Sequence, residues 1–223
     1  DCLNINYRKA AEWIINVSQY SLVESVRDVE DISLDPVKEV KQVKPVSIDE
    51  LKQYDYVHPY MFKRKLTDEI IEKFEVGYDP KLDAITFPVY NNGICEFVLK
   101  RSTKSKRFYM PEGITKPVYG LDYLTSDEVY VTESVINCLT LWSWGYQAVA
   151  LFGTGDDYQT NILKNMPQRK VILCLDPDNA GRNGTKKLLK ALDNKLITVK
   201  EITPGKDVND LTKEEFDNLP ETF

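Results

Sequence analysis

Residues 171–182 read Val171-Ile172-Leu173-Cys174-Leu175-Asp176-Pro177-Asp178-Asn179-Ala180-Gly181-Arg182. An apolar run typical of a buried strand ends there in two carboxylates and a glycine. Side chains two residues apart on an extended segment project to the same side, so Asp176 and Asp178 can face one small space. Two anions this close repel each other unless a cation or a hydrogen-bond network lies between them. The pattern therefore predicts a divalent-cation site at the end of a strand.

Two other segments also place acids at or just beyond the end of a predicted strand. Residues 128–132 are followed by Glu133, and residues 197–202 are followed by Asp207 and Asp210. In an open parallel α/β sheet, ligands bind at the carboxyl ends of the strands, so these acids can converge without being neighbours in sequence. A simpler explanation for Asp178 is that it caps the helix predicted over residues 180–192. The paired spacing together with Glu133 favours the metal site.

The order of these motifs resembles the Toprim domain shared by bacterial-type primases, topoisomerases and some nucleases. The segments before residue 125 are similar to primases among these. The resemblance runs from about Val57 to Leu211, and the segments that carry it are residues 66–78, 83–93, 107–113, 118–121, 128–133, 148–155, 176–181 and 205–211. Each motif alone is weak, but their shared order is specific.

The resemblance implies an α/β chain in which a Toprim parallel sheet flanked by helices follows a smaller α+β subdomain. We expect an amino-terminal helix and linker over residues 1–46, the α+β subdomain over 47–125, the Toprim domain over 126–211 and a carboxyl-terminal helix or tail over 212–223. The residues favour the same division. A hairpin joined through Asn91-Asn92-Gly93 is predicted in the earlier part, whereas strands and helices alternate after Thr125.

The same resemblance implies the catalytic core of a DNA primase of the DnaG-like family. Such an enzyme makes short RNA primers on a single-stranded DNA template from ribonucleoside triphosphates by metal-dependent nucleotidyl transfer. The expected catalytic residues are Glu133, Asp176 and Asp178, and with Asp207 they are the expected ligands of Mg2+ or Mn2+. Glu133 either orients a metal ion or helps to deprotonate the attacking 3′-hydroxyl. A replicative helicase is the expected protein partner.

The chain departs from the family pattern at two positions. Primases of this type carry an acid one helical turn after the glutamate, where this chain has Asn137, and a second acid in the closing motif, where it has Asn209. Both changes weaken the predicted metal site. An asparagine can still offer a carbonyl oxygen to magnesium, and Asp210 can substitute for the acid missing at Asn209.

The net charge of −6 argues against nucleic-acid binding, because phosphate neutralisation dominates such affinity. The distribution of charge matters more than the sum. Residues 100–107 hold five cations and no acid, and Phe108 and Tyr109 follow them. A solvated hairpin loop is the simpler explanation, but the family resemblance favours a template or nucleotide contact. The residues expected to make this contact are Lys100, Arg101, Lys106 and Arg107.

The four cysteines are widely scattered and have no spacing typical of a zinc site. Cys138 and Cys174 fall within apolar patterns, so we expect buried thiols. Primases of this type begin with a zinc ribbon that reads the template, and we expect that module to lie outside this sequence, which starts at Asp1 without a methionine. The sequence has no apolar run long enough to span a membrane, so we expect the cytoplasm of a bacterial cell or phage-infected host.

Two other functions fit the same residues. A Toprim-type nuclease would use the same acids to cut phosphodiester bonds. A non-catalytic nucleic-acid-binding protein would keep the fold without the activity, and Asn137 and Asn209 favour it. Ribonucleotide joining separates the primase from both.

Overall fold

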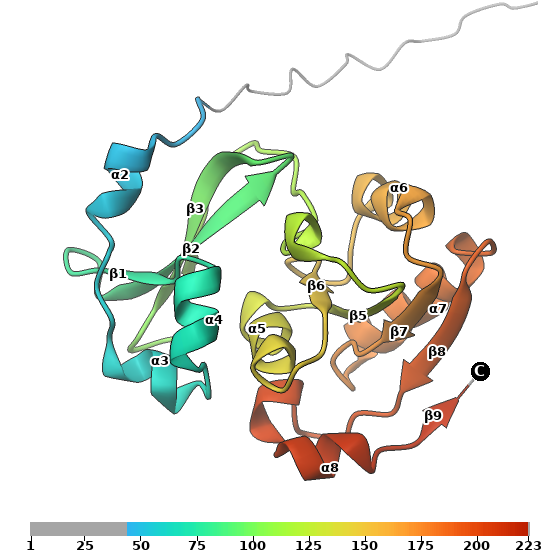
Figure 1. The fold of residues 1–223 in the computed structure, drawn as a ribbon. Helices are drawn as coiled ribbons and strands as arrows, with labels where there is room; N and C mark the ends of the chain where they lie inside the picture. Colours follow the sequence, from blue (N-terminus) through green and yellow to red (C-terminus); the bar gives the residue numbers. More distant parts are fainter. Residues whose placement is uncertain (1–43, 223) are drawn as a thin grey trace, which may run out of the picture. The chain divides into compact units, whose positions relative to one another are not determined.

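The computed structural model describes residues 44–222, all of which belong to one compact unit (Figure 1). The amino-terminal helix expected near residues 7–19, most of the expected linker and Cys2 lie outside the described residues. None of the described helices is long and apolar enough to cross a membrane.

The first part of the described chain is an antiparallel sheet preceded by three short helices. The helices are α2 (Ile48–Lys52), α3 (Pro59–Lys63) and α4 (Asp68–Lys73), and the strands, in sheet order, are β1 (Gly77–Asp79), β2 (Ala84–Asn91), β3 (Ile94–Ser102) and β4 (Phe108–Tyr109). The side chains of Ser47 and Thr67 cap α2 and α4 by accepting hydrogen bonds from backbone N–H groups of the first turn. The predicted hairpin is confirmed, because Asn92 and Gly93 adopt positive φ between β2 and β3.

The second part is a mostly parallel sheet covered by helices. Its strands, in chain order, are β5 (Glu128–Thr132), β6 (Ala148–Ala150), β7 (Lys170–Leu173), β8 (Leu196–Lys200) and β9 (Glu221–Thr222). The connecting helices are α5 (Val135–Ser143), α6 (Asp157–Asn165), α7 (Asn179–Ala191) and α8 (Lys213–Asp217), with 3-10 turns η1 (Leu121–Tyr123) and η2 (Val208–Asp210). The predicted fold class is confirmed.

The strand order explains where a site can form. The sheet runs β6-β5-β7-β8-β9, with the first four strands parallel and β9 antiparallel to β8. From β5 the chain passes through α5 to one side of the sheet, and from β7 it passes through α7 to the other. The carboxyl ends of β5 and β7 therefore flank a topological switch point, where open α/β sheets bind ligands. The short strand β9 was not predicted; two residues carry too little pattern to be recognised.

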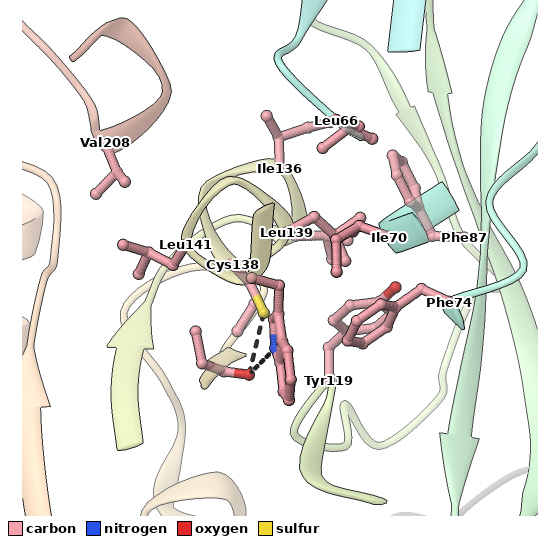
Figure 2. Packing of buried hydrophobic residues seen from close by; sticks show 14 of the residues in the cluster. Leu66, Ile70, Phe74, Phe87, Tyr119, Ile136, Cys138, Leu139, Leu141 and Val208 are labelled. Atoms are coloured by element: carbon pink, nitrogen blue, oxygen red, sulfur yellow. Dashed lines mark hydrogen bonds between the residues drawn. The ribbon is translucent and has the colours of Figure 1, made fainter. Parts of the chain in front are cut away.

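Helix α5 is buried along its length and joins the two sheets. Every residue from Val135 to Trp142 is buried, which is typical of a helix surrounded by other elements. Figure 2 shows Ile136 and Leu139 beside Leu66 and Ile70 of the α4 region, with Phe87 of β2 beyond them. The predicted burial of Cys138 and Cys174 is confirmed.

The opposite side of α5 is fastened to β6. The Cys138 Sγ lies 3.2 Å from the backbone oxygen of Ala148, and the Trp142 indole Nε1 donates to the same oxygen at 2.9 Å (Figure 2). One hydrophobic cluster therefore includes residues of both sheets. Trp142 is part of this core.

We expect Leu139→Ala to lower the free energy of unfolding by about 2–5 kcal/mol, because the side chain is fully buried between the two sheets and its removal leaves a cavity. Leu189→Ala is the matched control, since Leu189 is 40% exposed on α7 and should cost about 0.5 kcal/mol or less. Urea denaturation measures both. Equal losses in the two variants would contradict the central position of α5.

Candidate catalytic and metal-binding site

The first two predicted acids meet at the switch point. Glu133 directly follows β5, and its Oε1 accepts a hydrogen bond from the backbone N–H of Asp176 at 3.1 Å. Asp176 lies in the loop between β7 and α7. The two carboxylates, 43 residues apart in sequence, therefore come from adjacent parallel strands and face the same space.

Asp178 and Asp207 each cap a helical turn and still belong to this cluster. The Oδ1 of Asp178 accepts from the backbone N–H of Gly181 at 2.8 Å, and the Oδ1 of Asp207 accepts from that of Asp210 at 3.1 Å. Each cap occupies one carboxylate oxygen and leaves the other available. Capping and metal binding are therefore compatible for both residues.

Burial and mutual repulsion make Glu133 and Asp176 harder to ionise. Burial, followed by the charges of Asp176 and Asp178, raises the pKa of Glu133 to about 7. Burial also raises the pKa of Asp176, with contributions from Asp207, Asp178 and Asp210. Among residues 44–222, none of these acids forms an ion pair with a lysine or arginine. The cluster therefore holds uncompensated negative charge.

The donor set fits a hard divalent cation. All four predicted ligands offer carboxylate oxygens, which Mg2+ and Mn2+ prefer. Within the part of the chain that the structure describes, no three acidic, histidine or cysteine side chains lie close enough together to hold a metal ion by themselves. Mg2+ typically binds through one or two carboxylates and keeps several waters, so an open cluster suits it better than it suits zinc.

Glycine is required where α7 begins. A Cβ at Gly181 would lie 2.0 Å from the backbone oxygen of Asp176 and 2.7 Å from the Oε1 of Glu133. The helix can therefore approach the carboxylates only because this position has no side chain.

The two asparagines at positions where the resemblance leads us to expect acids are buried beside the cluster. Asn137 donates from Nδ2 to the Oδ1 of Asp176 at 3.3 Å, and its Oδ1 accepts from the backbone N–H of Asn209 at 3.2 Å. The carbonyl oxygen of Asn137, which we expected to be offered to magnesium, already accepts this hydrogen bond from Asn209. Asp210, expected to substitute for Asn209, accepts from the backbone N–H of Asp207 at 3.0 Å.

The four predicted basic residues occupy different environments. Lys100 is held by the protein, because its Nζ pairs with the Oδ2 of Asp79 and the hydroxyl of Tyr54, both at 2.8 Å. Lys106 and Arg107 are exposed between β3 and β4, and the Arg107 guanidinium lies 4.8 Å from the Tyr109 ring centroid. Arg101 is the one of the four whose charge interacts with an acid of the cluster, Asp207.

Arg64 is a candidate binding residue that the sequence analysis missed. Burial lowers the pKa of Arg101, and the positive charge of Arg64 lowers it further. The Nε atoms of both arginines are buried without a hydrogen-bond partner in the described chain. Two guanidinium groups whose charges interact, each with an unused Nε donor, are suited to an anion such as phosphate. Arg64 stands in the run Lys63-Arg64-Lys65, which has no sequence signal beyond that of a surface segment.

A cavity of about 300 Å3 opens beside Glu133 and Asp176. Most of its remaining wall is apolar and comes from β3, β4 and the residue after it, from α5 and from the loop after β6: Leu99, Phe108, Met110, Val135 and Phe152. The acidic cluster therefore borders a space that can receive an organic group.

Comparison with known proteins identifies the class of fold. Residues 130–212 match the Toprim-like family model. No curated protein sequence matches the chain. The described fold is that of primase catalytic cores, with a Toprim-like domain carrying the predicted acids.

Three solved structures illustrate this likeness. The zinc-binding and RNA polymerase domains of the Aquifex aeolicus primase are 19% identical, with a TM-score of 0.59 over 74% of this chain and 56% of that chain. The DnaG primase catalytic domain bound to single-stranded DNA is 20% identical, with a TM-score of 0.59 over 70% and 67%. The primase fragment of the bacteriophage T7 primase-helicase protein is 18% identical, with a TM-score of 0.59 over 76% and 74%.

We expect Glu133→Gln to stabilise the cation-free chain at pH 8 and to leave its stability unchanged at pH 4. The folded chain raises the pKa of Glu133 from its ordinary 4.5 to about 7 through burial and the charge of Asp176. Below pH 4.5 the Glu133 carboxyl is protonated in both the folded and the unfolded chain, so it does not change the free energy of unfolding there. As the pH rises from 4.5 to about 7, the unfolded chain ionises first, and the free energy of unfolding falls.

Urea denaturation in EDTA across this pH range measures the effect. Glu214→Gln, on the exposed face of α8, is the control and should change little at either pH. A gain from Glu133→Gln that is equal at pH 4 and pH 8 would contradict the assignment.

Proposed function

We propose that this chain is the catalytic core of a DNA primase, which joins ribonucleotides into a short RNA on a single-stranded DNA template. The observation that carries this proposal is the pairing of two sites of opposite charge. The acidic cluster around Glu133 and Asp176 includes Asp207, whose charge interacts with the buried Arg101, and Arg101 in turn interacts with the half-buried Arg64; the Nε donors of both arginines are unused. Nucleotidyl transfer requires this combination, because a triphosphate and its metal ion must be bound together.

The acids would hold Mg2+ or Mn2+ through Glu133, Asp176, Asp178 and Asp207. When bound, the cation would neutralise the triphosphate and the charge that develops during transfer. Arg64 and Arg101 would bind the triphosphate oxygens through their free N–H donors. Glu133 would either orient the cation or help to deprotonate the attacking 3′-hydroxyl.

The template would be bound by exposed residues of the β3–β4 connection. Lys106 and Arg107 are free to contact phosphates, and the exposed ring of Phe108 can stack on a base. Lys100 would support this surface from behind, because its charge is already paired with Asp79.

The primase is preferred to a Toprim nuclease because the likeness extends beyond the Toprim-like domain. The solved primases align with 70–76% of the chain, more than the 83 residues matched by the Toprim-like model can account for. This proposal has three consequences. A zinc ribbon would read the template, a replicative helicase would be the protein partner, and the protein would act in the cytoplasm of a bacterial cell or phage-infected host.

The decisive experiment is template-dependent ribonucleotide joining with Mg2+ or Mn2+. We expect the double variant Asp176→Asn, Asp178→Asn to lose the activity by about 100-fold or more, because it removes two ligand charges without changing side-chain shape. Asp193→Asn is the control, since Asp193 is an exposed residue paired with Lys164.

The alternatives give different results in the same reactions. Cleavage of DNA without triphosphates, lost in the double variant, would replace the primase by the nuclease. Binding of single-stranded DNA without joining or cleavage, also with an added zinc-ribbon module, would replace it by the non-catalytic protein.

We further expect Arg64→Ala and Arg101→Ala each to raise the KM for ribonucleoside triphosphates by about 10-fold or more, because each removes charge-assisted hydrogen bonds to phosphate. Steady-state kinetics at varied triphosphate concentration measure this. Arg169→Ala should leave KM unchanged, since that side chain is 79% exposed and pairs with Asp127. An unchanged KM in both site variants would exclude the arginine pair as the triphosphate site.

A further inference from the structure

Asn137 and Asn209 form a continuous chain of buried hydrogen bonds next to the acidic cluster. Their exposed fractions are 1% and 4%. At one end, Asn137 Nδ2 donates to Asp176 Oδ1 at 3.3 Å, and in the middle the backbone N–H of Asn209 donates to Asn137 Oδ1 at 3.2 Å. The chain thus begins at a predicted metal ligand.

The other end of these hydrogen bonds reaches the backbone of Arg64. Asn209 Nδ2 donates to the backbone oxygen of Arg64 at 2.7 Å and to the Thr140 Oγ1 at 2.9 Å. Lys65 adds a bond from its Nζ to the backbone oxygen of Asn209 at 2.6 Å. A carboxylate beyond β7 is therefore linked through two amides to the residue that follows α3.

The neighbouring atoms require amides at both positions. A backbone N–H can only donate, so the oxygen of Asn137 must face Asn209 and its NH2 group must face Asp176. An aspartate at position 137 would have no proton to offer Asp176 and would add a like charge. At position 209 the partners include a carbonyl and a hydroxyl that already donates to Ile136 O at 2.8 Å, so a donor is needed there too.

We propose that Asn137 and Asn209 are positioning residues that hold the Asp176 carboxylate and Arg64 at a fixed spacing, and that neither is a ligand of the cation. The sequence analysis expects these two asparagines to weaken the metal site. In the structure they instead form an uncharged link between its cation-binding part and its anion-binding part. This inference rests on the proposed function for the identity of the two ligands.

The test measures binding of two simple probes to the 223-residue chain: Mn2+ alone, and inorganic tripolyphosphate in EDTA. We expect Asn137→Ala to weaken Mn2+ binding by about 10-fold, as is typical for the loss of a residue that orients a ligand. Asn209→Ala, which touches no carboxylate through its side chain, should weaken tripolyphosphate binding and also reduce Mn2+ affinity several-fold. The double variant should lose less than the product of the two single effects.

Gln147→Ala separates positioning from general destabilisation. Gln147 makes three hydrogen bonds with Thr125 and Ser126 at the opposite end of the sheet, so its loss should lower the melting temperature without changing either affinity. If Asn137→Ala and Asn209→Ala also lower only the melting temperature, or if each affects only the probe nearest to it, the link is refuted. If the wild-type chain binds no Mn2+, the proposed function fails instead.

Discussion

The burial of helix α5 between the two sheets is the constraint on which the site depends. Its residues from Val135 to Trp142 contact the α4 region on one side and β6 on the other, so the helix cannot shift without opening the core. Glu133 lies just before its N-cap, Ser134, and Asn137 lies one turn later. The packing of apolar side chains therefore fixes the positions of two polar residues whose own interactions would not suffice. Rigid support of this kind is what a catalytic arrangement requires.

The site keeps opposite charges near each other without pairing them. Arg101 is 9% exposed and interacts with Asp207, yet the two do not form an ion pair. A direct pair would satisfy both groups and leave nothing for a ligand. Holding unpaired donors near half-buried carboxylates costs stability, because partly desolvated charge is compensated only when a partner binds. The apolar core around α5 offsets that cost.

The sequence predicts features that depend on local pattern. The caps at Ser47 and Thr67, the Asn92-Gly93 turn and the acids after β5 and β7 are each encoded within a few neighbouring residues. The convergence of the carboxylates could be predicted from the sequence, because parallel strands end at one edge of a sheet.

Features that arise from distant contacts were not predictable in this way. Lys65 bonds to Asn209 across 144 positions, and the pairing of Lys100 with Asp79 consumes a charge that looked free. Arg64 becomes notable only when its neighbour Arg101 is seen. A run of lysine and arginine has the same pattern whether its side chains are solvated or buried, so charge alone could not identify the arginine pair.

The two asparagines also change the balance between stability and metal dependence. With acids at both positions the cluster would hold two more negative charges at sites that are 1% and 4% exposed, and the folded chain would depend more on a bound cation to relieve their repulsion. Amides at the same positions satisfy the backbone of Asn209 and Arg64 without adding charge. The chain thereby retains the carboxylates that line the cavity. The buried asparagines behind them hold neighbouring groups in place without adding charge.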